Sequence, residues 1–415
     1  MRIELITIGD ELLLGQIINT NVAYIGGKLG KVGLRLAAQM SLPDEEAELE
    51  RFLREALERS DVVITTGGLG PTVDDATKAV FCSIFGKKLS LKGEILDDLK
   101  RRYGENLSEA VRSQAVVPEE TEIIENKAGT APGFIFTGED GMAVALPGPP
   151  RELRPMFEEI VLPRLGRLAA SGGFFLEKTL RTVAIREADV DRRMRQVIPD
   201  VEGVQYGLMA RPYQVDIRLS CVTEGKERAE ALISEAERRV RDEFGESIFG
   251  EADQKLEAVV GQMLRQSGLS ISLAESCTGG LISSRLTDIS GSSDYLRGTM
   301  VVYSNQWKQE LLGVPEEVLM QHGAVSEQTA RLMAENVRGK GRSDIGLAIT
   351  GIAGPTGGTS EKPVGLVYIA FSDGEETFSK KFSFVGDREM VKFRSSQAAL
   401  EMIRRYLLAR KKGAD

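Results

Sequence analysis

The sequence predicts an α/β protein built from two three-layer α/β domains joined by a small α+β module. Short apolar runs, such as residues 3–8 and 61–66, alternate with charged amphipathic segments such as residues 44–59. This alternation is typical of a parallel sheet that is covered by helices on both faces. The chain has 415 residues, enough for about three domains at roughly 150 residues each. The pattern changes between residues 174 and 250, where two strands follow each other with no helix between them.

The first predicted domain spans residues 1–170. Its first strand is an apolar run that ends at Gly9, and Asn19 or Thr20 is placed to cap the following helix. The predicted elements are the strands Ile3–Ile8, Asp61–Thr66, Gly133–Thr137 and Met142–Leu146 and the helices Asn19–Lys31, Asp44–Arg59, Asp75–Phe85 and Arg151–Leu168. Folds of this kind bind ligands where the parallel strands end and the loops face a crevice.

A short junction, Ser171-Gly172-Gly173, separates this domain from the middle module, predicted at residues 174–250. The third domain, residues 251–415, returns to the α/β alternation. The module is predicted to contain the strands Leu176–Ile185, Val204–Leu208 and Gln214–Val222 and the helices Asp189–Val197 and Lys226–Phe244. The third domain is predicted to contain the strands Ser270–Ala274, Thr299–Tyr303, Ile345–Thr350, Val364–Phe371 and Glu376–Phe384, the helices Leu256–Gln266 and Arg388–Ala409, and helices that begin after Gly280 and at Asn305.

Composition limits the classes of function. The net charge of −9 argues against a general surface for nucleic acid. No apolar run approaches the ~20 residues of a membrane span and the N-terminus is not a signal peptide, so we expect a cytoplasmic protein. Cys82, Cys221 and Cys277 have no spacing that suggests zinc or a disulfide framework. His322 is the lone histidine, so a catalytic base must come from Lys, Asp, Glu or Tyr if His322 is structural.

A glycine loop with two aspartates follows the second predicted strand. The glycines would let the backbone approach an anion, and the start of the next helix would supply N–H donors. The aspartates suit a divalent metal ion that lies between carboxylates and phosphates. The end of the first strand should lie in the same crevice, because adjacent parallel strands end side by side. The predicted nucleotide-binding residues are Gly9, Asp10, Glu11, Gly67, Gly68, Gly70 and Thr72, and the predicted metal ligands are Asp74 and Asp75.

Each part of this site also has a simpler interpretation. Thr72 and Asp75 have the spacing of a capping box, and acids are expected in the first turn of a helix. Asp10 and Glu11 could form an ordinary turn. The segment Pro147–Glu152 could contact the ligand or could serve only as a rigid start for the following helix.

The segment Glu275–Gly280 also connects a strand to a helix. It contains a serine, a cysteine and a threonine where the N–H groups of a helix start could stabilise an oxyanion or a phosphate. Ser276 needs a base, and Lys308 is the best candidate because a buried lysine can lose its charge. Lys308 could instead be an exposed helical lysine. Cys277 could be a buried core residue or the rival nucleophile.

Other polar segments of the third domain could bind phosphate or sugar. Two loops, Ser290–Ser293 and Thr350–Thr359, offer hydroxyl and backbone N–H groups, although either could be a flexible turn. Arg388 and Arg394 begin the last helix and could neutralise a phosphate or simply be exposed.

Together these motifs resemble the CinA (competence/damage-inducible protein A) family along nearly the whole chain. The matching segments are Gly9–Gly15, Thr66–Asp75, Leu146–Pro150, Glu275–Gly280, Tyr303–Asn305 with Lys308, Gly323–Ser326, Thr350–Pro355 and Lys362–Gly365. The resemblance implies a first domain similar to molybdopterin-binding domains but with metal-dependent ADP-ribose pyrophosphatase activity. It implies that the third domain, without a cofactor, deamidates nicotinamide mononucleotide to nicotinic acid mononucleotide and ammonia. It also implies a homodimer.

The resemblance assigns roles to individual residues as well. It implies that Ser276 is the nucleophile and Lys308 its base, and that Asp10 joins the aspartates of the glycine loop on the metal or phosphate side. The substrate-binding residues that it implies are Thr278, Gly279, Gly280, Tyr303, Asn305, Gly351 and Arg388. The middle module resembles a KH-type domain, but its expected Gly-x-x-Gly turn reads Ile185-Arg186-Glu187-Ala188. We therefore expect a structural module that does not bind nucleic acid.

Two alternatives belong to other classes. The chain could be a nucleotide-binding scaffold or regulator with a catalytically silent first domain. It could also be a molybdopterin-binding protein, although a deamidase-like third domain has no role in that pathway.

Overall fold

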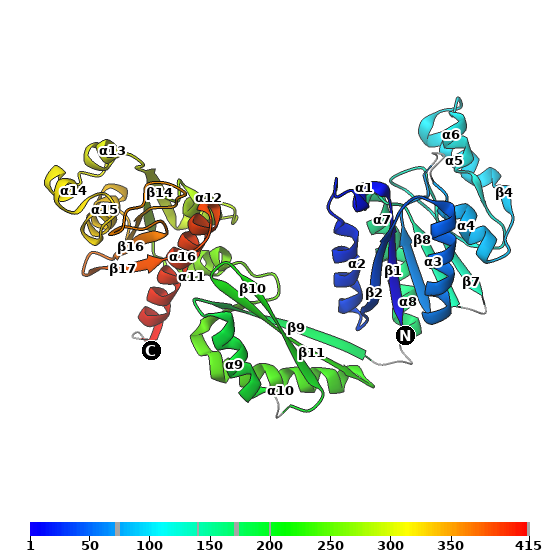
Figure 1. Cartoon of the computed structure of the whole chain (residues 1–415), viewed down its shortest axis with the longest axis horizontal. Coiled ribbons are helices and arrows are strands. Elements are labelled where there is room, and N and C mark those ends of the chain that lie inside the picture. Colours follow the sequence, from blue (N-terminus) through cyan, green and yellow to red (C-terminus); the bar gives the residue numbers. More distant parts are fainter. Residues whose placement is uncertain (71–74, 139–140, 170–173, 199–200, 413–415) are drawn as a thin grey trace. The chain divides into compact units, whose positions relative to one another are not determined.

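The computed structural model describes residues 1–70, 75–138, 141–169, 174–198 and 201–412 (Figure 1). The chain divides into two compact units, Met1–Glu177 with Ser220–Ser234 and Lys178–Leu219 with Glu235–Asp415. Within the described ranges, no helix is both long enough and apolar enough to cross a membrane.

A six-stranded sheet in the order β2-β1-β3-β8-β7-β6 forms the first domain (Figure 1). Its strands are β1 Ile3–Ile8, β2 Leu36–Leu42, β3 Val62–Thr66, β6 Glu122–Ile124, β7 Gly133–Gly138 and β8 Gly141–Leu146. Strands β2, β1, β3 and β8 are parallel, as the sequence predicts, whereas β7 and β6 pair antiparallel. The expectation of a wholly parallel sheet is wrong at this edge, because the short connection between β7 and β8 cannot cross over the sheet. A separate antiparallel pair joins β4 Leu89–Leu91 to β5 Val116–Pro118.

Helices cover both faces of this sheet, which makes the domain three-layered. The helices are α1 Asp10–Leu13, α2 Thr20–Lys31, α3 Glu46–Arg59, α4 Thr77–Ile84, α5 Gly93–Tyr103, α6 Glu109–Ser113, α7 Pro150–Met156 and α8 Leu162–Ala169. Side chains alternate along β1, so that Ile3 and Leu5 pack with α2, α7 and α8. Ile6 and Ile8 point the other way and pack with α3 and α4.

Two helix ends show how the sequence sets local structure. The Asn19 side chain caps α2 by accepting a hydrogen bond from the Val22 N–H, as predicted. The predicted continuous helix Arg151–Leu168 is instead interrupted by a π-helical segment, Phe157–Val161, between α7 and α8. The prolines at 155 and 163, on either side of this segment, cannot donate helical hydrogen bonds.

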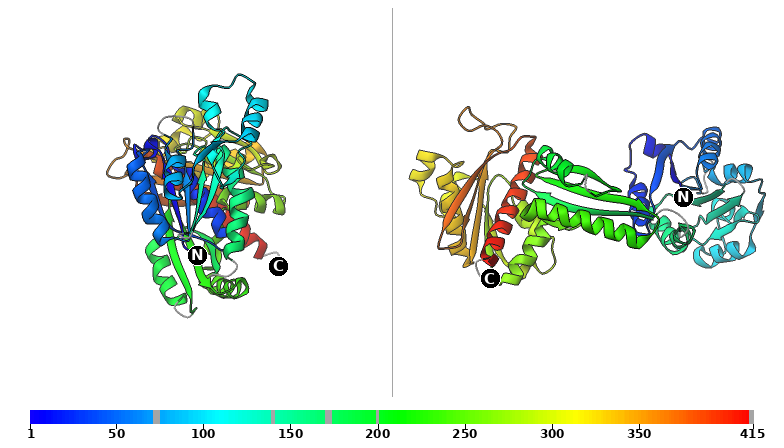
Figure 2. Two further views of the ribbon diagram at one scale, coloured as in Figure 1. Left: turned by 90° about the vertical axis from the view of Figure 1, so that its right-hand side faces the viewer. Right: turned by 90° about the horizontal axis from the view of Figure 1, so that it is seen from below.

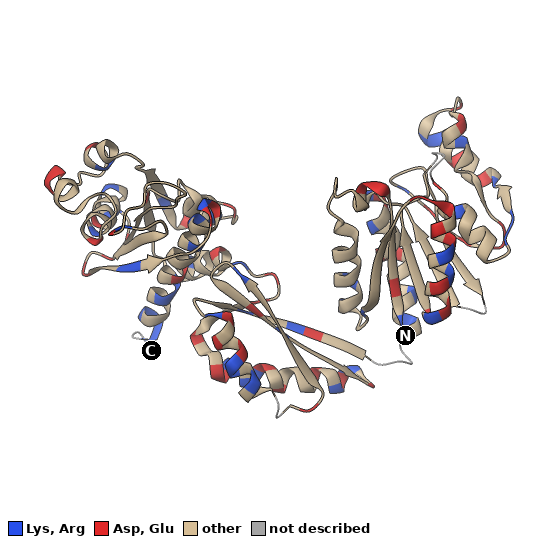
Figure 3. Ribbon diagram, viewed as in Figure 1, with Lys and Arg blue, Asp and Glu red and all other residues tan. Residues whose placement is uncertain are grey.

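The middle module is a four-stranded sheet in the order β10-β11-β9-β12, with two helices on one side (Figure 1). Its elements are β9 Phe174–Val183, α9 Glu187–Val197, β10 Val204–Arg211, β11 Gln214–Thr223, α10 Lys226–Phe244 and β12 Ile248–Glu251. Ala229, Ile233, Ala236 and Val240 form a buried stripe along α10 at helical spacing. Acidic and basic residues are interspersed along α9 and α10 (Figure 3), so that neither helix presents a basic surface.

The third domain contains a five-stranded sheet in the order β14-β13-β15-β16-β17. Its strands are β13 Ile271–Glu275, β14 Leu296–Val301, β15 Ile345–Gly351, β16 Leu366–Ser372 and β17 Thr377–Ser383. Strands β14, β13 and β15 are parallel, and β16 and β17 continue the sheet antiparallel. The sheet is mixed because β16 and β17 follow each other with no helix between them.

Helices cover both faces of this sheet too. They are α11 Leu256–Ser267, α12 Leu281–Thr287, α13 Asn305–Glu310, α14 Glu316–His322, α15 Glu327–Gly341 and α16 Arg388–Lys412. Residues of α11, α12 and α16 form one core with the sheet (Figure 2), and residues of α14 and α15 form the other. The fold class predicted from the sequence is therefore confirmed: two three-layer α/β domains and a small α+β module.

The close approach of β1 to the glycine loop predicts a steric test. Gly67 has a φ of 107°, and a Cβ atom there would lie 2.2 Å from the Ile8 carbonyl oxygen. We expect Gly67→Ala to lower the free energy of unfolding by about 2 kcal/mol or more. In the control, Gly27→Ala within α2, a Cβ meets nothing within 4 Å, so helix propensity should raise stability by about 0.5–1 kcal/mol. Urea unfolding measures both, and equal effects of the two substitutions would contradict the steric argument.

Candidate functional site

The turn after β13 places Ser276 at the carboxyl edge of the third-domain sheet. The Ser276 N–H donates to the Ile349 carbonyl of β15, with an N···O distance of 3.1 Å. Gly279 and Gly280 have φ angles of 63° and 94°, and glycine adopts this left-handed region without strain. The turn therefore folds back tightly and leads into α12.

Lys308 reaches this turn from α13. The Ser304 side chain caps α13 by accepting from the Trp307 N–H, which fixes the helix one turn before Lys308. Lys308 Nζ lies 3.0 Å from Ser276 Oγ and 2.8 Å from the Val302 carbonyl oxygen. It also lies 3.2 Å from the Tyr303 carbonyl oxygen. The structure thus brings together the two residues that the sequence pairs as nucleophile and base.

Burial changes the acid–base properties of Lys308. Its side chain is 1% exposed, and desolvation lowers its pKa from 10.5 to about 8. A neutral amine has two N–H bonds, which the carbonyls of Val302 and Tyr303 can accept. The lone pair of the Lys308 nitrogen can then accept a hydrogen bond from the hydroxyl of Ser276. The interpretation of Lys308 as an exposed helical lysine is wrong.

Cys277, the rival nucleophile, is in a different environment. It is 5% exposed, and burial raises the pKa of its thiol from 9.0 to about 12. A thiol reacts as the thiolate, so this environment suppresses its reactivity at neutral pH. Cys277 also belongs to the buried core beside β13, which matches its structural interpretation.

Glu275 changes the expected role of the helix start. Its carboxylate accepts hydrogen bonds from three backbone N–H groups, at Gly280, Ile282 and Ser283, over distances of 2.9–3.2 Å. The expectation that these N–H groups face a ligand is therefore wrong, because a buried anion of the protein already occupies the helix terminus. Within the described residues, the N–H groups of Cys277 and Thr278 have no backbone acceptor.

Thr278 adds another polar group at the turn. The residue is fully buried, and its Oγ1 has no hydrogen-bond partner among the described residues. A buried hydroxyl without a partner is costly unless a ligand or water completes its hydrogen bonding.

Three segments predicted to bind the substrate meet at the start of α16. Arg388 donates through Nη2 to the hydroxyl of Tyr303 and through Nη1 to the carbonyl of Gly354, both at 2.9 Å. Gly351 ends β15, three residues before Gly354. Asn305 is the exposed first residue of α13, and no contact joins it to Arg388 among the described residues.

Lys392 is a basic residue that the sequence did not identify, whereas Arg394 was considered as a phosphate ligand or an exposed arginine. Lys392 Nζ lies 3.9 Å from the position that a Cβ on Gly279 would occupy. Its position one helical turn after Arg388 is the signal that could have identified it. Arg394, in contrast, donates to the carbonyl of Val385 and so anchors the turn before α16.

The ends of β1, β3 and β8 surround a cavity of about 390 Å³ in the first domain. The predicted residues Gly9, Glu11, Gly67, Gly68, Gly70 and Asp75 line it, together with the turn Pro147–Pro149. The predicted shared crevice is thus present, since β1, β3 and β8 are adjacent and parallel. Glu152, from the Pro147–Glu152 segment, also lines the cavity, as do Asp44 and Thr130, which were not predicted.

Asp75 closes the glycine loop instead of starting a helix. Its Oδ1 accepts from the Gly70 N–H at 2.7 Å, and α4 begins two residues later, at Thr77. The predicted helix start at Asp75 is therefore wrong. Thr72 and Asp74 lie outside the described residues. The capping-box interpretation of Thr72 and the metal-ligand role of Asp74 therefore stay predictions.

The cavity concentrates carboxylates. The Asp10 N–H donates to Asp44 Oδ2 at 3.2 Å. Burial raises the pKa of Asp44, and the nearby carboxylates of Asp10, Glu11 and Asp75 raise it further. Carboxylate oxygens are the ligands that hard divalent cations prefer. Among the described residues, however, no three His, Cys, Asp or Glu side chains converge closely enough to hold a metal ion by themselves.

Comparison with known proteins identifies three families along the chain. The family described as "Probable molybdopterin binding domain" matches residues 4–167. The families "Damage-inducible protein CinA KH domain" and "CinA C-terminal domain" match residues 177–250 and 253–407. These three families follow one another in the order that the sequence predicts.

Full-length relatives are also similar. A CinA-like protein of Syntrophus aciditrophicus is 44% identical over 416 residues, covering 99% of each chain. A CinA-like protein of Kosmotoga olearia is 41% identical over 411 residues, covering 98% of this chain and 99% of that protein. A solved structure, the competence/damage inducible protein CihA from Agrobacterium tumefaciens, is 40% identical. It covers 36% of this chain and 91% of its own, with a TM-score of 0.35.

Proposed function

Because the chain belongs to the CinA family, we propose that its third domain deamidates nicotinamide mononucleotide, with Ser276 as nucleophile and Lys308 as base. The observation that carries the proposal is the buried pair itself, with Lys308 Nζ 3.0 Å from Ser276 Oγ. A serine beside a lysine of lowered pKa is an arrangement suited to acyl transfer without histidine.

The proposed reaction has two halves. Neutral Lys308 takes the hydroxyl proton as Ser276 Oγ attacks the carboxamide carbon, and the carbonyl becomes an oxyanion. Lys308 then returns the proton to the departing nitrogen, so that ammonia leaves and an ester remains on Ser276. Water then attacks the ester carbon with Lys308 again as base. The bond from that carbon to Ser276 Oγ breaks, Lys308 returns the proton to Oγ, and the carboxylic acid product leaves.

Charge stabilisation would come from two N–H groups of the turn that have no backbone acceptor among the described residues and that interact with the Cys277 thiol. The N–H groups of Cys277 and Thr278 are the proposed oxyanion donors, because Glu275 occupies those of the helix start. Arg388 and Lys392 are the proposed ligands of the substrate phosphate. Tyr303, which Arg388 orients through its hydroxyl, would lie against the nucleotide.

Substitutions separate the serine from the cysteine. We expect Ser276→Ala and Lys308→Ala to lower ammonia release from nicotinamide mononucleotide by roughly a thousandfold or more. Lys308→Arg should not restore it, because a guanidinium does not give up its proton. Cys277→Ala in the full chain should stay within about threefold of the parent, since Cys277 has only a packing role. A loss confined to Cys277→Ala would overturn the serine assignment.

The lowered pKa of Lys308 predicts a pH profile. Lys308 acts as a base only when neutral, so kcat/KM should rise about tenfold per pH unit below pH 8 and level off above it. Initial rates from about pH 6 to about pH 9.5 measure this. A profile that keeps rising to a midpoint near the ordinary lysine pKa would contradict a desolvated base.

For the first domain we propose metal-dependent hydrolysis of the pyrophosphate of ADP-ribose. The support is a cavity at the glycine loop that is lined by Glu11, Asp44 and Asp75. A divalent ion bound there would neutralise the phosphates and activate water. Asp74 and Asp75 are the proposed protein ligands, and the substrate phosphates would complete the shell, as is common for Mg²⁺. We further propose that the chain is a homodimer and acts in the cytoplasm.

Metal removal tests this second activity. EDTA should abolish ADP-ribose hydrolysis by the full chain, and added Mg²⁺ or Mn²⁺ should restore it. Asp74→Asn and Asp75→Asn should each lower the rate by roughly a hundredfold. Asp97→Asn, an exposed residue of α5 outside the cavity, is the matched control. Tight nucleotide binding with no product under any metal would favour the alternative of a silent binding domain.

A further inference from the structure

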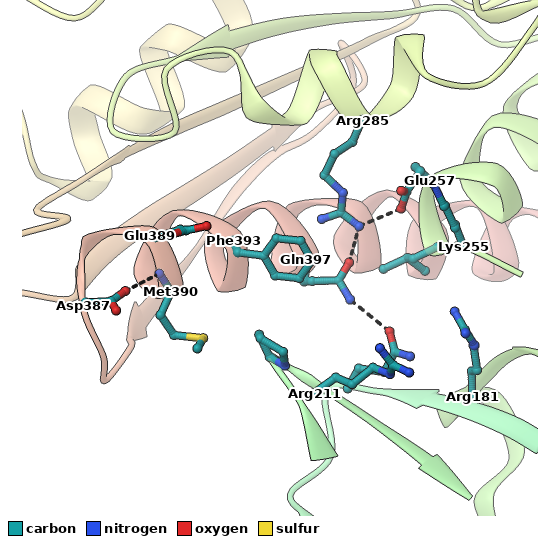
Figure 4. A pocket seen from close by; sticks show the side chains of 13 residues that line it. Arg181, Arg211, Lys255, Glu257, Arg285, Asp387, Glu389, Met390, Phe393 and Gln397 are labelled. Carbon is teal, nitrogen blue, oxygen red and sulfur yellow. Dashed lines mark hydrogen bonds and ion pairs between the residues drawn. The ribbon is translucent and has the colours of Figure 1, made fainter. Parts of the chain in front are cut away.

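A cavity of about 640 Å³ lies in the second unit, between strands of the middle module and helices of the third domain (Figure 4). Strands β9–β11 form one wall, and α11, α12 and the start of α16 form the other. Its volume is within the range of about 300–1,000 Å³ that is typical of small-molecule sites. None of its lining residues has a role in the reaction proposed for Ser276.

One end of this cavity is basic. Arg181 donates through Nη1 to the Gln254 carbonyl at 2.9 Å. Its buried Nε lies 4.0 Å from Asp216 Oδ1 and makes no hydrogen bond to a described residue. Lys255 is exposed at the N-cap of α11, which has no side-chain cap, and forms no ion pair with a described residue. Arg211 adds a third positive charge, already paired with Asp216. At this end of the cavity, Arg181 Nε and the Lys255 ammonium are therefore available as hydrogen-bond donors to an anion.

The middle of the cavity is apolar and amide-lined. The ring of Phe393 is 37% exposed, with the guanidinium of Arg285 4.9 Å from its centroid. Gln397 and Gln214 are 2% and 7% exposed, and Gln397 Nε2 donates to Gln214 Oε1 over a long 3.4 Å. Arg285 is neutralised by Glu257 at 2.7 Å. A planar ring could stack on Phe393. The amides of Gln397 and Gln214 are already bonded to each other, to Arg285 and to Asp216, and so fix this wall of the cavity.

The other end is acidic. Asp387 and Glu389 line it at the start of α16, away from Arg181 and Lys255 in Figure 4. Asp387 accepts from the Met390 N–H, and Glu389 forms no ion pair with a described residue. The cavity therefore has opposite charge at its two ends, with an aromatic ring between them.

We propose that this cavity is a second binding site, for a dipolar mononucleotide. Its phosphate would lie at Arg181 and Lys255, and a positively charged ring would lie over Phe393 towards Asp387 and Glu389. The choice of a pyridinium nucleotide as the ligand rests on the proposed function. The charge pattern of the cavity is an observation that is independent of that function. Helix α16 carries Phe393 and Gln397 into this cavity, places Lys392 near Gly279 of the Ser276 turn, and carries Arg388 to Tyr303. Occupancy is thus linked to the catalytic turn through one rigid helix.

Hydrogen exchange of the full-length Ser276→Ala chain tests the proposal without turnover. The probes are nicotinamide mononucleotide, adenosine monophosphate and inorganic phosphate. We expect nicotinamide mononucleotide to slow exchange in the segment Arg211–Gln214, which contributes nothing to the Ser276 site. Lys255→Glu and Glu389→Lys, both at exposed residues, should each weaken this effect about tenfold or more. Lys340→Glu, at an exposed lysine of α15, should leave it unchanged.

The other outcomes are decisive as well. Slowed exchange at the Ser276 turn alone would overturn the second site and leave the proposed function standing. Equal protection by inorganic phosphate or by adenosine monophosphate would overturn the dipolar ligand, since neither carries a cationic ring. Protection of Arg211–Gln214 by nicotinamide mononucleotide, with no ammonia released by the parent chain, would overturn the proposed function and support the second site.

Discussion

The third-domain site depends on the burial of one lysine. Lys308 is held among two carbonyl oxygens and the hydroxyl of Ser276, with no acidic partner among its hydrogen bonds. An ammonium in such surroundings is poorly compensated, so the fold favours the neutral amine. The sheet makes this arrangement possible, because the Val302 N–H donates to the Glu275 carbonyl at 2.8 Å and so aligns the ends of β14 and β13. The energetic cost of burying the lysine lowers its pKa, and this would allow it to act as the base of the proposed reaction.

A second buried charge, on Glu275, has the opposite role. Its side chain is fully buried, and the three N–H groups that it accepts compensate its charge. The first turn of α12 is therefore locked to the end of β13. The helix dipole stabilises the protein's own carboxylate, so that in the proposed reaction the oxyanion would be stabilised by N–H groups earlier in the turn, at Cys277 and Thr278. Glu275 fixes the turn, and Lys308 is the residue proposed to act as base.

The sequence predicts a structural feature well when a pattern of neighbouring residues or an unusual composition determines it. It predicts a feature poorly when tertiary contacts determine it. The strand at Ile3–Ile8, the Asn19 cap and the pairing of Ser276 with Lys308 were predictable from apolar runs, capping preference and the scarcity of histidine. Strand β2, Leu36–Leu42, alternates with a period of two but was missed, because the adjacent small residues Ala37 and Ala38 weaken the contrast between its two faces. Asp44, Thr130 and Lys392 were missed because tertiary contacts alone bring them to the sites. The role of Glu275 could not be predicted, since a carboxylate beside a helix start can face inward or outward with the same sequence.

The two α/β domains place similar turns at similar sheet edges but differ in what those turns can bind. In the third domain Glu275 already accepts hydrogen bonds from the start of α12, and the residues around the turn are basic: Lys308, Arg388 and Lys392. The phosphate of the proposed nucleotide would therefore meet positive charge without a metal ion. In the first domain Glu11, Asp44 and Asp75 line the cavity, and their mutual repulsion adds to the raised pKa of Asp44. A pyrophosphate brought among these carboxylates would be repelled. The proposed binding would require a cation that enters with the substrate, because the described carboxylates do not converge into a complete shell. The metal requirement proposed for the first domain would therefore be an electrostatic condition for binding, before any chemistry begins.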